Sequence, residues 1–309
     1  MTSPLSDEVW KKRADFRQQT RKFFDDHGYL EVETPHLLRR PSLEPHLDPY
    51  PVGLEHGKKG YLNTSPEVNL KKLLGSTQLK KIYELAHSYR SGERGGWHRS
   101  EFIMLEWYAR GYLLQDLMEE CSVFLESLFP SLPQHQIKVS DWFKKNLGIA
   151  PEFDSMRQYL GSQGLGKVEE MDWSECFFRL FLPTESKLEP MGIVFLYDYP
   201  EELSSYAKVK GGVAKRFEVY LHGVEVGNAF EERTSRHDML EQLQKEERER
   251  AELQKERLFI DDEFAGALDH IKEPVSGIAM GWDRLFSLWL GDEELEKNCP
   301  YPNWADEDG

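Results

Sequence analysis

Two glutamates in the segment RFEVYLHGVEVGNAFEE, residues 216–232, are spaced in a way that suits metal chemistry. His222-Gly223 is a typical two-residue turn between β-rich flanks, so the spacing predicts a β-hairpin. The turn sets three cross-strand pairs: Leu221 with Val224, Tyr220 with Glu225, and Glu218 with Gly227. Because side chains alternate along a strand, we expect one apolar face and one face that carries carboxylates. The apolar face comprises Phe217, Val219, Leu221, Val224 and Val226, and the carboxylate face comprises Glu218, Tyr220 and Glu225.

Two neighbouring carboxylates repel each other unless a cation lies between them. The sequence places no Lys or Arg on the expected carboxylate face, which favours a bound cation, and Mg²⁺ prefers such hard oxygen ligands together with phosphates. Glycine at 227 leaves room for a ligand to approach Glu218. Asn228, Phe230 and Glu232 follow and extend the same candidate site. An ordinary hairpin with an exposed polar face is the alternative.

A second candidate segment is YRSGERGGWHRSEF, residues 89–102, which combines arginines, glycines, a Trp and a His. Three interpretations fit these residue types: a flexible contact to nucleic acid, a phosphate-binding loop of an enzyme, and an exposed hairpin tip.

The surrounding elements are predicted from caps, turn residues and periodicity. We expect a helix from the N-cap Ser6 to about Asp26, with Gly28 as its stop. YLEVET is strand-like, and residues 41–60 have loop character. We expect helices at 66–74, 112–128 and 236–257, the last with solvated charged faces. Strands are expected at IYELAHSYR and FIMLEWYARGY, and SGIAMGWDRLFSLWLG predicts strand, turn and helix. Residues 131–190 predict no clear element.

This element order fits one α+β domain over residues 1–309, with an antiparallel sheet flanked by helices, better than alternating β–α–β units. Apolar residues make up 39% and aromatic residues 12% of the chain, which is enough for a core. No apolar run approaches the roughly 20 residues that span a bilayer, and the N-terminus lacks a signal-peptide pattern. Cys121, Cys176 and Cys299 lie far apart without a CxxC pair, as expected for reduced thiols of a cytoplasmic protein.

The net charge of −16 argues against a surface that binds nucleic acid throughout. Residues 1–110 carry 18 Lys and Arg against 15 Asp and Glu, a balance of +3. The remaining residues carry 21 against 40, a balance of −19. We therefore expect an acidic partner to approach the N-terminal third of the chain.

Three segments in order resemble the motifs of class II aminoacyl-tRNA synthetases. GYLEVETPHL resembles motif 1, YRSGERGGWHRSEFIMLEWY resembles motif 2, and GIAMGWDRLFSLWLG resembles motif 3. YLNTSPE, EFIMLEWY and FEVYLHGVEVGNAFEE further resemble the lysine branch of this class. The resemblance extends from about residue 5 to residue 291.

Motif 1 begins within about 30 residues of Met1, so we expect no N-terminal anticodon-binding OB domain. A chain of this form resembles the elongation factor P–(R)-β-lysine ligases. That resemblance implies ATP-dependent activation of a lysine-type amino acid as an aminoacyl adenylate, followed by transfer to a lysine of elongation factor P. It also implies a homodimer with the motif 1 helix and Pro35 at its interface.

The resemblance assigns ATP-binding roles to matching residues. Arg90 matches the arginine that bridges the α-phosphate and the substrate carboxylate, and Arg284 matches the one beside the terminal phosphates; these two are the catalytic candidates. Asp283 precedes Arg284 and is expected to orient it. Glu218 and Glu225 match the ligands of the Mg²⁺ that accompanies ATP. The full predicted ATP set is Arg90, Glu93, His98, Arg99, Phe102, Glu218, Glu225, Val226, Gly281 and Arg284.

The amino-acid pocket is implied by the same comparison. Glu67 matches the acceptor for the substrate's amino group, and Glu106, Tyr108 and Glu232 match the pocket for the side-chain ammonium. The full predicted substrate set is Ser65, Pro66, Glu67, Glu106, Tyr108, Asn228, Phe230, Glu232 and Ala279. Ala279 stands where lysyl-tRNA synthetases usually have glycine, and its methyl group is expected to favour a β-amino acid; a packing alanine is the alternative.

Motif 2 departs from the family pattern at two places. The family's glutamate two residues after the arginine is Gly92 here, and Glu93 follows one place later. Arg99 also stands where the family has asparagine. Two alternatives to the expected activity therefore stay open: an enzyme that loads lysine onto tRNA or another carrier, and a catalytically silent paralogue with a regulatory role. The acidic charge and the missing anticodon domain count against tRNA.

Overall fold

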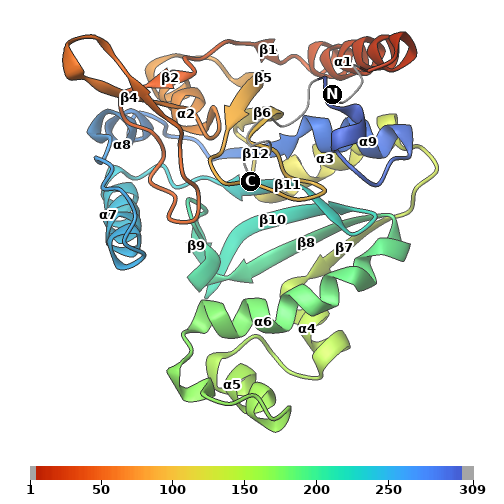
Figure 1. Ribbon diagram of the computed structural model, residues 1–309, viewed down its shortest axis with the longest axis vertical. Helices are drawn as coiled ribbons and strands as arrows, with labels where there is room; N and C mark the ends of the chain where they lie inside the picture. The colour runs from red at the N-terminus through yellow and green to blue at the C-terminus, as the bar shows by residue number, and fades with distance from the viewer. Residues whose placement is uncertain (1–4, 301–309) are drawn as a thin grey trace. The chain divides into compact units, whose positions relative to one another are not determined.

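The structure of the protein is a computed structural model, of which residues 5–300 are described (Figure 1). The chain divides into two compact units. The described residues of 1–112 and 233–309 form unit 1, and residues 113–232 form unit 2. We describe each unit by itself, and the expectation of one domain over residues 1–309 stays a prediction.

The main sheet of unit 1 has the strand order β1-β5-β6-β12. β1 (Leu30–Glu31) runs parallel to β5 (Lys81–Tyr89), while β6 (Glu101–Arg110) is antiparallel both to β5 and to β12 (Val275–Gly281). The two strands expected on either side of the arginine-rich loop are thereby confirmed.

A small second sheet in unit 1 corrects the expectation of a loop at residues 41–60. β2 (Leu37–Leu38) and β3 (Pro51–Gly53) both pair with β4 (Lys59–Leu62), and a short helical turn, η1 (Glu55–Gly57), lies between β3 and β4. Such short strands contain too few residues to show a clear alternation, which is why the sequence pattern missed them.

The first helix of unit 1, α1 (Asp7–Asp26), begins and ends as predicted. The Ser6 hydroxyl accepts a hydrogen bond from the Val9 amide at 3.3 Å, and Gly28 has a positive φ of 75° just past the helix end. Phe16 of α1 lies fully buried against Trp282 of α9 (Trp282–Leu290), with ring centroids 5.2 Å apart. α1 therefore packs against the helix that carries the motif 3 arginine.

Two further helices of unit 1 come unusually close. α2 (Glu67–Ser76) contacts α8 (Asp262–Leu268), and a Cβ added at Gly75 would lie only 2.1 Å from the Ala267 carbonyl oxygen. Only glycine fits at this crossing.

The charged helix α7 (Arg236–Glu252) corrects the expectation that its faces are simply solvated. It buries one stripe of residues at helical spacing: Met239, Gln242, Leu243, Glu246 and Arg250. The stripe mixes polar with apolar residues, so a hydrophobic pattern alone did not reveal it.

The sheet of unit 2 has the order β11-β10-β8-β7, and β9 (Val209–Lys210) pairs with β10. β11 (Val224–Glu231), β10 (Val213–Leu221) and β8 (Ile193–Pro200) are antiparallel, and β7 (Gln134–Lys138) is parallel to β8. The antiparallel pairing in both units, with helices flanking the strands, confirms the α+β class.

The helices of unit 2 include three in the stretch that the sequence left undefined. α3 (Leu114–Leu128) contacts β10 and β11, while α4 (Val139–Leu147), α5 (Phe153–Ser162) and α6 (Trp173–Glu185) gather beside the β7–β8–β10 strands (Figure 1). Their buried aromatic residues form one cluster: Trp142, Phe143, Phe177 and Phe181. Short helical turns η2 (Val168–Glu170), η3 (Ser186–Met191), η4 (Glu201–Leu203) and η5 (Glu296–Asn298) complete the described chain.

All three cysteines are buried free thiols, as predicted. Between residues 5 and 300, no helix combines the length and the apolar character needed to cross a membrane.

Candidate active site

The arginine-rich segment forms a loop between β5 and β6, as the motif 2 resemblance implies. The Arg90 amide donates to the Ser100 carbonyl at 2.9 Å, which closes the base of the loop. Gly92 and Gly95 have positive φ angles of 78° and 138°, so the loop uses glycine where other residues would be strained.

A cavity of about 220 Å³ opens beside this loop in unit 1. It is lined by His46, Leu47, Asp48, Arg90, Ser91, Gly92, Glu93, Arg94 and His98. The cavity thus brings together three of the predicted ATP-binding residues. Arg94 and residues 46–48 were not predicted from the sequence.

Arg90 is held in place from two sides. Its Nε donates to the Thr64 carbonyl at 3.2 Å, and its guanidinium lies 5.1 Å from the centroid of the Phe102 ring. Phe102 therefore supports the arginine in the described structure, whereas the sequence assigned it to adenine stacking.

Arg284, at the start of α9, donates from Nε to the Trp97 carbonyl at 2.9 Å. A Cβ added at the neighbouring Gly281 would lie 3.3 Å from Arg284 Cδ, so this glycine leaves room for the arginine's own aliphatic chain.

The charges of Arg90 and Arg284 both act on His98. Burial together with the charges of Arg284 and Arg90 lowers its pKa, and Glu93 opposes this shift. The Glu93 carboxylate is 3.6 Å from His98 Nε2. Glu93 therefore faces the cavity one position after Gly92, where the family keeps its glutamate.

Arg99 is not among the residues that line the cavity. Arg99 is buried, and its positive charge lowers the pKa of Cys299. Burial and the charge of Asp283 outweigh this effect and raise the Cys299 pKa to about 12.

The carboxylate of Asp283 is held by other elements of unit 1, and its expected role in orienting Arg284 stays a prediction. Its two carboxylate oxygens accept from the buried Arg13 guanidinium of α1 and from the Ile103 amide of β6, the latter at 2.6 Å. Asp283 thus joins α1 and the motif 2 strand β6 to the motif 3 helix α9.

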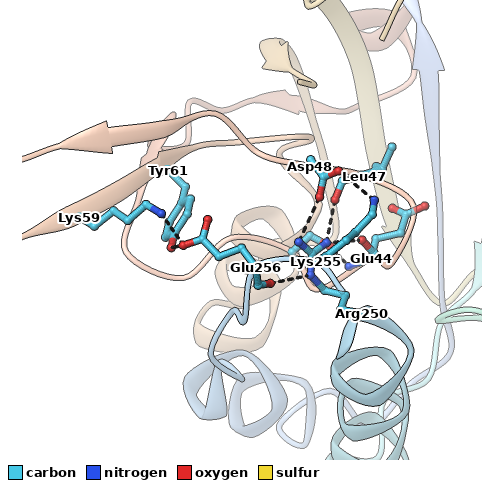
Figure 2. A network of polar contacts seen from close by, with 9 residues as sticks. Glu44, Leu47, Asp48, Lys59, Tyr61, Arg250, Lys255 and Glu256 are labelled. Carbon is cyan, nitrogen blue, oxygen red and sulfur yellow. Dashed lines mark hydrogen bonds and ion pairs between the residues drawn. The ribbon is translucent and has the colours of Figure 1, made fainter. Parts of the chain in front are cut away.

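Residues 46–48 form one wall of the cavity and are fixed by the end of α7 (Figure 2). The buried Arg250 donates to the Glu44 and Leu47 carbonyls at 3.1 and 2.9 Å and to the Asp48 carboxylate at 3.1 Å. Lys255 donates to the other Asp48 oxygen at 2.9 Å. Burial would raise the pKa of Asp48, but these two cations outweigh it and lower the pKa.

The same wall is joined to the arginine-rich loop, because the Ser91 amide donates to the Asp48 carbonyl at 2.8 Å. Arg250 also donates to the carbonyl of Glu256 at 3.4 Å, and the Glu256 carboxylate accepts from Tyr61 at 2.9 Å and from Lys59 (Figure 2). About 200 residues separate Arg250 from Asp48 in sequence, so no local pattern could have revealed this contact.

The predicted amino-acid pocket lies partly in unit 1. Glu67 is the first residue of α2, directly after the half-buried Ser65 and the buried Pro66. Glu106 and Tyr108 are buried on β6, and the Tyr108 hydroxyl donates to Glu106 at 2.6 Å. The Tyr108 hydroxyl is thus a hydrogen-bond partner for the buried Glu106 carboxylate, which an apolar strand would otherwise leave without one.

β12 supplies the neighbours of these two side chains. Ala279 pairs with Glu106, and Gly277 pairs with Tyr108. A Cβ at Gly277 would lie 2.1 Å from the Tyr108 ring, so the tyrosine requires glycine there. Gly277 is a site-supporting residue that the sequence analysis did not single out.

The predicted hairpin is present in unit 2, with one register correction. His222 and Gly223 both have positive φ, at 50° and 77°, as the two-residue turn requires. Leu221 pairs with Val224 and Tyr220 with Glu225, as predicted. The strands then shift register, so that Glu218 pairs with Asn228 instead of Gly227.

The cause is a β-bulge at Val226, which has no partner of its own between two regular pairs. Val226 is buried at the bulge. Beyond it the faces of β11 exchange, and Asn228 and Phe230 join the face of Glu218. Glu232, also buried, follows β11 in an isolated bridge with Ala207.

The expectation of a carboxylate face without a balancing cation is wrong. Arg216 pairs with Phe230 in register and donates to Glu218 and, at 2.9 Å, to Asn228. Tyr199 and Tyr220 donate to the second Glu218 oxygen, and burial together with this carboxylate raises both tyrosine pKa values well above their usual range.

The carboxylates nevertheless suit a hard cation. Glu225 is exposed and pairs with Tyr220, which lies on the same face of β10 as Glu218, two residues along the strand. Both carboxylates act electrostatically on Arg216 and Tyr220. Carboxylate oxygens of this kind, supplemented by phosphates, are the ligand set that Mg²⁺ accepts.

The whole chain can now be placed in a family. Residues 1–305 match the family model described as tRNA synthetases class II (D, K and N). The chain belongs to this family, and the predicted fold class agrees.

More specific relatives share nearly the full length of the chain. The elongation factor P–(R)-β-lysine ligase homolog of Aquifex aeolicus (strain VF5) is 39% identical over 285 residues, which cover 91% of this chain and 94% of the relative. The elongation factor P–(R)-β-lysine ligases of Vibrio atlanticus (strain LGP32) and Edwardsiella ictaluri (strain 93-146) are 31% and 33% identical, over 94% and 93% of this chain and 94% and 92% of the relatives. The resemblance expected from the motifs is confirmed.

Proposed function

We propose that this protein is an ATP-dependent ligase that activates a lysine-type amino acid and transfers it to a lysine of elongation factor P. The observation that carries the proposal is the similarity to relatives named for this activity, which extends over more than 90% of both chains. The substrate amino acid is (R)-β-lysine in this proposal, consistent with Ala279 beside Glu106.

The first step joins the amino acid to AMP. A carboxylate oxygen of the amino acid attacks the α-phosphorus of ATP, the bond to the bridging oxygen of the β-phosphate breaks, and pyrophosphate leaves. Arg90 holds the α-phosphate and the carboxylate, and Arg284 holds the terminal phosphates. Guanidinium groups suit both tasks because their fork binds oxyanions in two places. Catalysis of this kind depends on positioning and charge stabilisation without a protein nucleophile.

The adenine of ATP lies near Glu93 and His98 in this proposal. Glu93 binds the adenine amino group, a contact that the family's glutamate makes and that Gly92 at the same position does not offer. Support comes from the cavity that Glu93, His98 and Arg90 line together. Phe102, whose ring lies beside the Arg90 guanidinium, stacks on the adenine in this proposal, and Gly281 leaves space for Arg284.

Glu218 and Glu225 would hold Mg²⁺, which would neutralise phosphate charge when bound with ATP. Release of Glu218 from Arg216 would free an oxygen for this role, and Val226, at the bulge between the two carboxylates, belongs to the proposed ATP-binding residues.

The amino acid is held through its two ammonium groups. Glu67 receives the amino group near the carboxylate, and the family resemblance assigns Glu106, Tyr108 and Glu232 to the distal ammonium and Asn228 and Phe230 to the same amino acid. In the second step, the amine of the target lysine attacks the carbonyl carbon of the adenylate and loses a proton. An amide bond forms, and AMP leaves.

Amino-acid-dependent exchange of labelled pyrophosphate into ATP tests the first step. We expect exchange with (R)-β-lysine, a weaker signal with lysine, and none with leucine. No exchange with any lysine analogue would support the silent paralogue instead. Arg90→Met and Arg284→Met are each expected to reduce the exchange rate by about a hundredfold or more, as for other transition-state charge contacts.

A homodimer is part of the proposal. Trp10 of α1, Leu30 of β1 and Leu37 of β2 expose 42%, 50% and 47% of their surface, and Pro35 lies between β1 and β2. A subunit contact there would cover these side chains. Light scattering of the purified protein tests this, with twice the monomer mass of 36.2 kDa expected. We place the protein in the cytoplasm, where its proposed partner takes part in translation.

A further inference from the structure

A lysine of the protein itself lies within the predicted amino-acid pocket. Lys71 Nζ is 2.6 Å from Glu67 Oε1 and 5.6 Å from the centroid of the Tyr108 ring. Only 1% of the Lys71 side chain is exposed, against 15% of the Glu67 side chain. The group that is expected to receive a substrate ammonium therefore already holds an internal one.

Burial of the Lys71 ammonium distinguishes this ion pair from the ordinary pairs on a helix surface. Glu67 and Lys71 are four residues apart on α2, a spacing that on a helix surface stabilises only weakly. A buried ammonium, in contrast, loses its hydration and must be paired. Lys72, the next residue, provides the comparison: its side chain is 27% exposed and pairs with Asp261 of α8. Only Lys71 of these two points toward Tyr108.

The geometry leaves one side of Glu67 open. Oε1 accepts from Lys71, and within residues 5–300 no hydrogen bond to Oε2 is found. The carboxylate is thus fixed in direction by the buried ammonium while its partly exposed side stays accessible. A carboxylate held in this way recognises an ammonium at one place, because it cannot turn to follow a ligand.

We propose that Lys71 is a positioning residue that fixes the Glu67 carboxylate, and that it thereby sets the selectivity for an amino group near the substrate's carboxylate. This inference rests on the proposed function of the pocket. Without Lys71, the Glu67 carboxylate would be free to rotate, and the preference for a ligand that carries this amino group would fall.

The test compares two ligands that differ only in that group. (R)-β-lysine carries it, and 6-aminohexanoic acid lacks it but keeps the carboxylate and the distal ammonium. Dissociation constants for both are measured by calorimetry with wild type, Lys71→Met and the matched neighbour control Lys72→Met. We expect Lys71→Met to raise the dissociation constant of (R)-β-lysine about tenfold or more, as for loss of one partner of a buried pair. The dissociation constant of 6-aminohexanoic acid should rise much less. Lys72→Met should keep the wild-type ratio.

Two further variants keep the test decisive if Lys71→Met does not fold. Lys71→Arg retains the cation and should retain most of the preference. The double variant Glu67→Gln/Lys71→Met removes both charges and should lose it. An unchanged ratio in the folded Lys71 variants would overturn the inference. Pyrophosphate exchange by wild type is measured separately, so failure of the proposed activity is distinguished from failure of the role of Lys71.

Discussion

Single residues of the site are fixed by contacts that reach across unit 1. Asp283 illustrates this, because its carboxylate joins Arg13 of α1 to the Ile103 amide of β6 while its neighbour Arg284 faces the Trp97 carbonyl. These contacts join α1 and β6 to α9, the helix that carries Arg284.

Asp283→Asn should therefore destabilise the fold. Both Asp283 and Arg13 are buried, and removing the charge of one partner leaves the other uncompensated. We expect a loss of about 3 kcal/mol in the free energy of unfolding, measured by urea denaturation. Lys12→Met, which alters an exposed pair with Glu8 on the same helix, should change the stability by less than about 0.5 kcal/mol. Equal effects of the two variants would contradict this account.

His98 reports on the charge of the cavity. Because burial, Arg284 and Arg90 lower its pKa, we expect an apparent value below 6.5 in an NMR titration. The unfolded chain then binds the proton more readily than the folded chain, so this residue lowers stability as the pH falls below about 6.5 and has no effect well above it. Arg284→Met should raise the His98 pKa and Glu93→Gln should lower it further. Opposite shifts would show that these groups do not face His98.

At the scale of elements, α7 and the wall at residues 46–48 depend on each other. Arg250 lies near the C-terminal end of α7 and binds two groups of that wall, the Leu47 carbonyl and the Asp48 carboxylate, together with the Glu44 carbonyl just before it (Figure 2). The wall in turn accepts the Ser91 amide beside Arg90.

Arg250→Met is expected to loosen the wall and weaken nucleotide binding. If ATP must then order residues 44–48 on binding, its KM should rise by about three- to tenfold, while the KM for the amino acid stays nearly constant. Arg257→Gln is the matched control, because Arg257 is 76% exposed and pairs with Glu247. Hydrogen exchange of residues 44–48 should accelerate only in the Arg250 variant. A KM for ATP equal to that of the control would contradict the coupling.

The elements also show how far sequence reasoning reached. Local signals predicted α1 through Ser6 and Gly28, the strands around the arginine-rich loop, and the hairpin turn at His222-Gly223, since each depends on neighbouring residues. The bulge at Val226 was missed because it depends on cross-strand pairing, and it changed the partner of Glu218. Arg216, two residues before Glu218 on the same strand, shares its face by simple alternation and was overlooked. The wall at 46–48 and Lys71 were missed because burial is not visible in spacing.

The whole molecule is a class II synthetase fold with relatives named as elongation factor P–(R)-β-lysine ligases. Its net charge is −16, and we expect an acidic protein partner to approach the less acidic residues 1–110. Charge of this kind acts over about 10 Å at 0.1 M salt, so association with the partner should weaken as salt increases.

Transfer of the activated amino acid tests the central claim most directly. Purified protein is incubated with ATP, Mg²⁺ and radiolabelled (R)-β-lysine in the presence of both elongation factor P and tRNA, and the label is located on each carrier. The account predicts label on elongation factor P, in an amide bond to a lysine, with none on tRNA. It also predicts that replacing the target lysine by arginine abolishes the labelling. Label found only on tRNA would contradict the account.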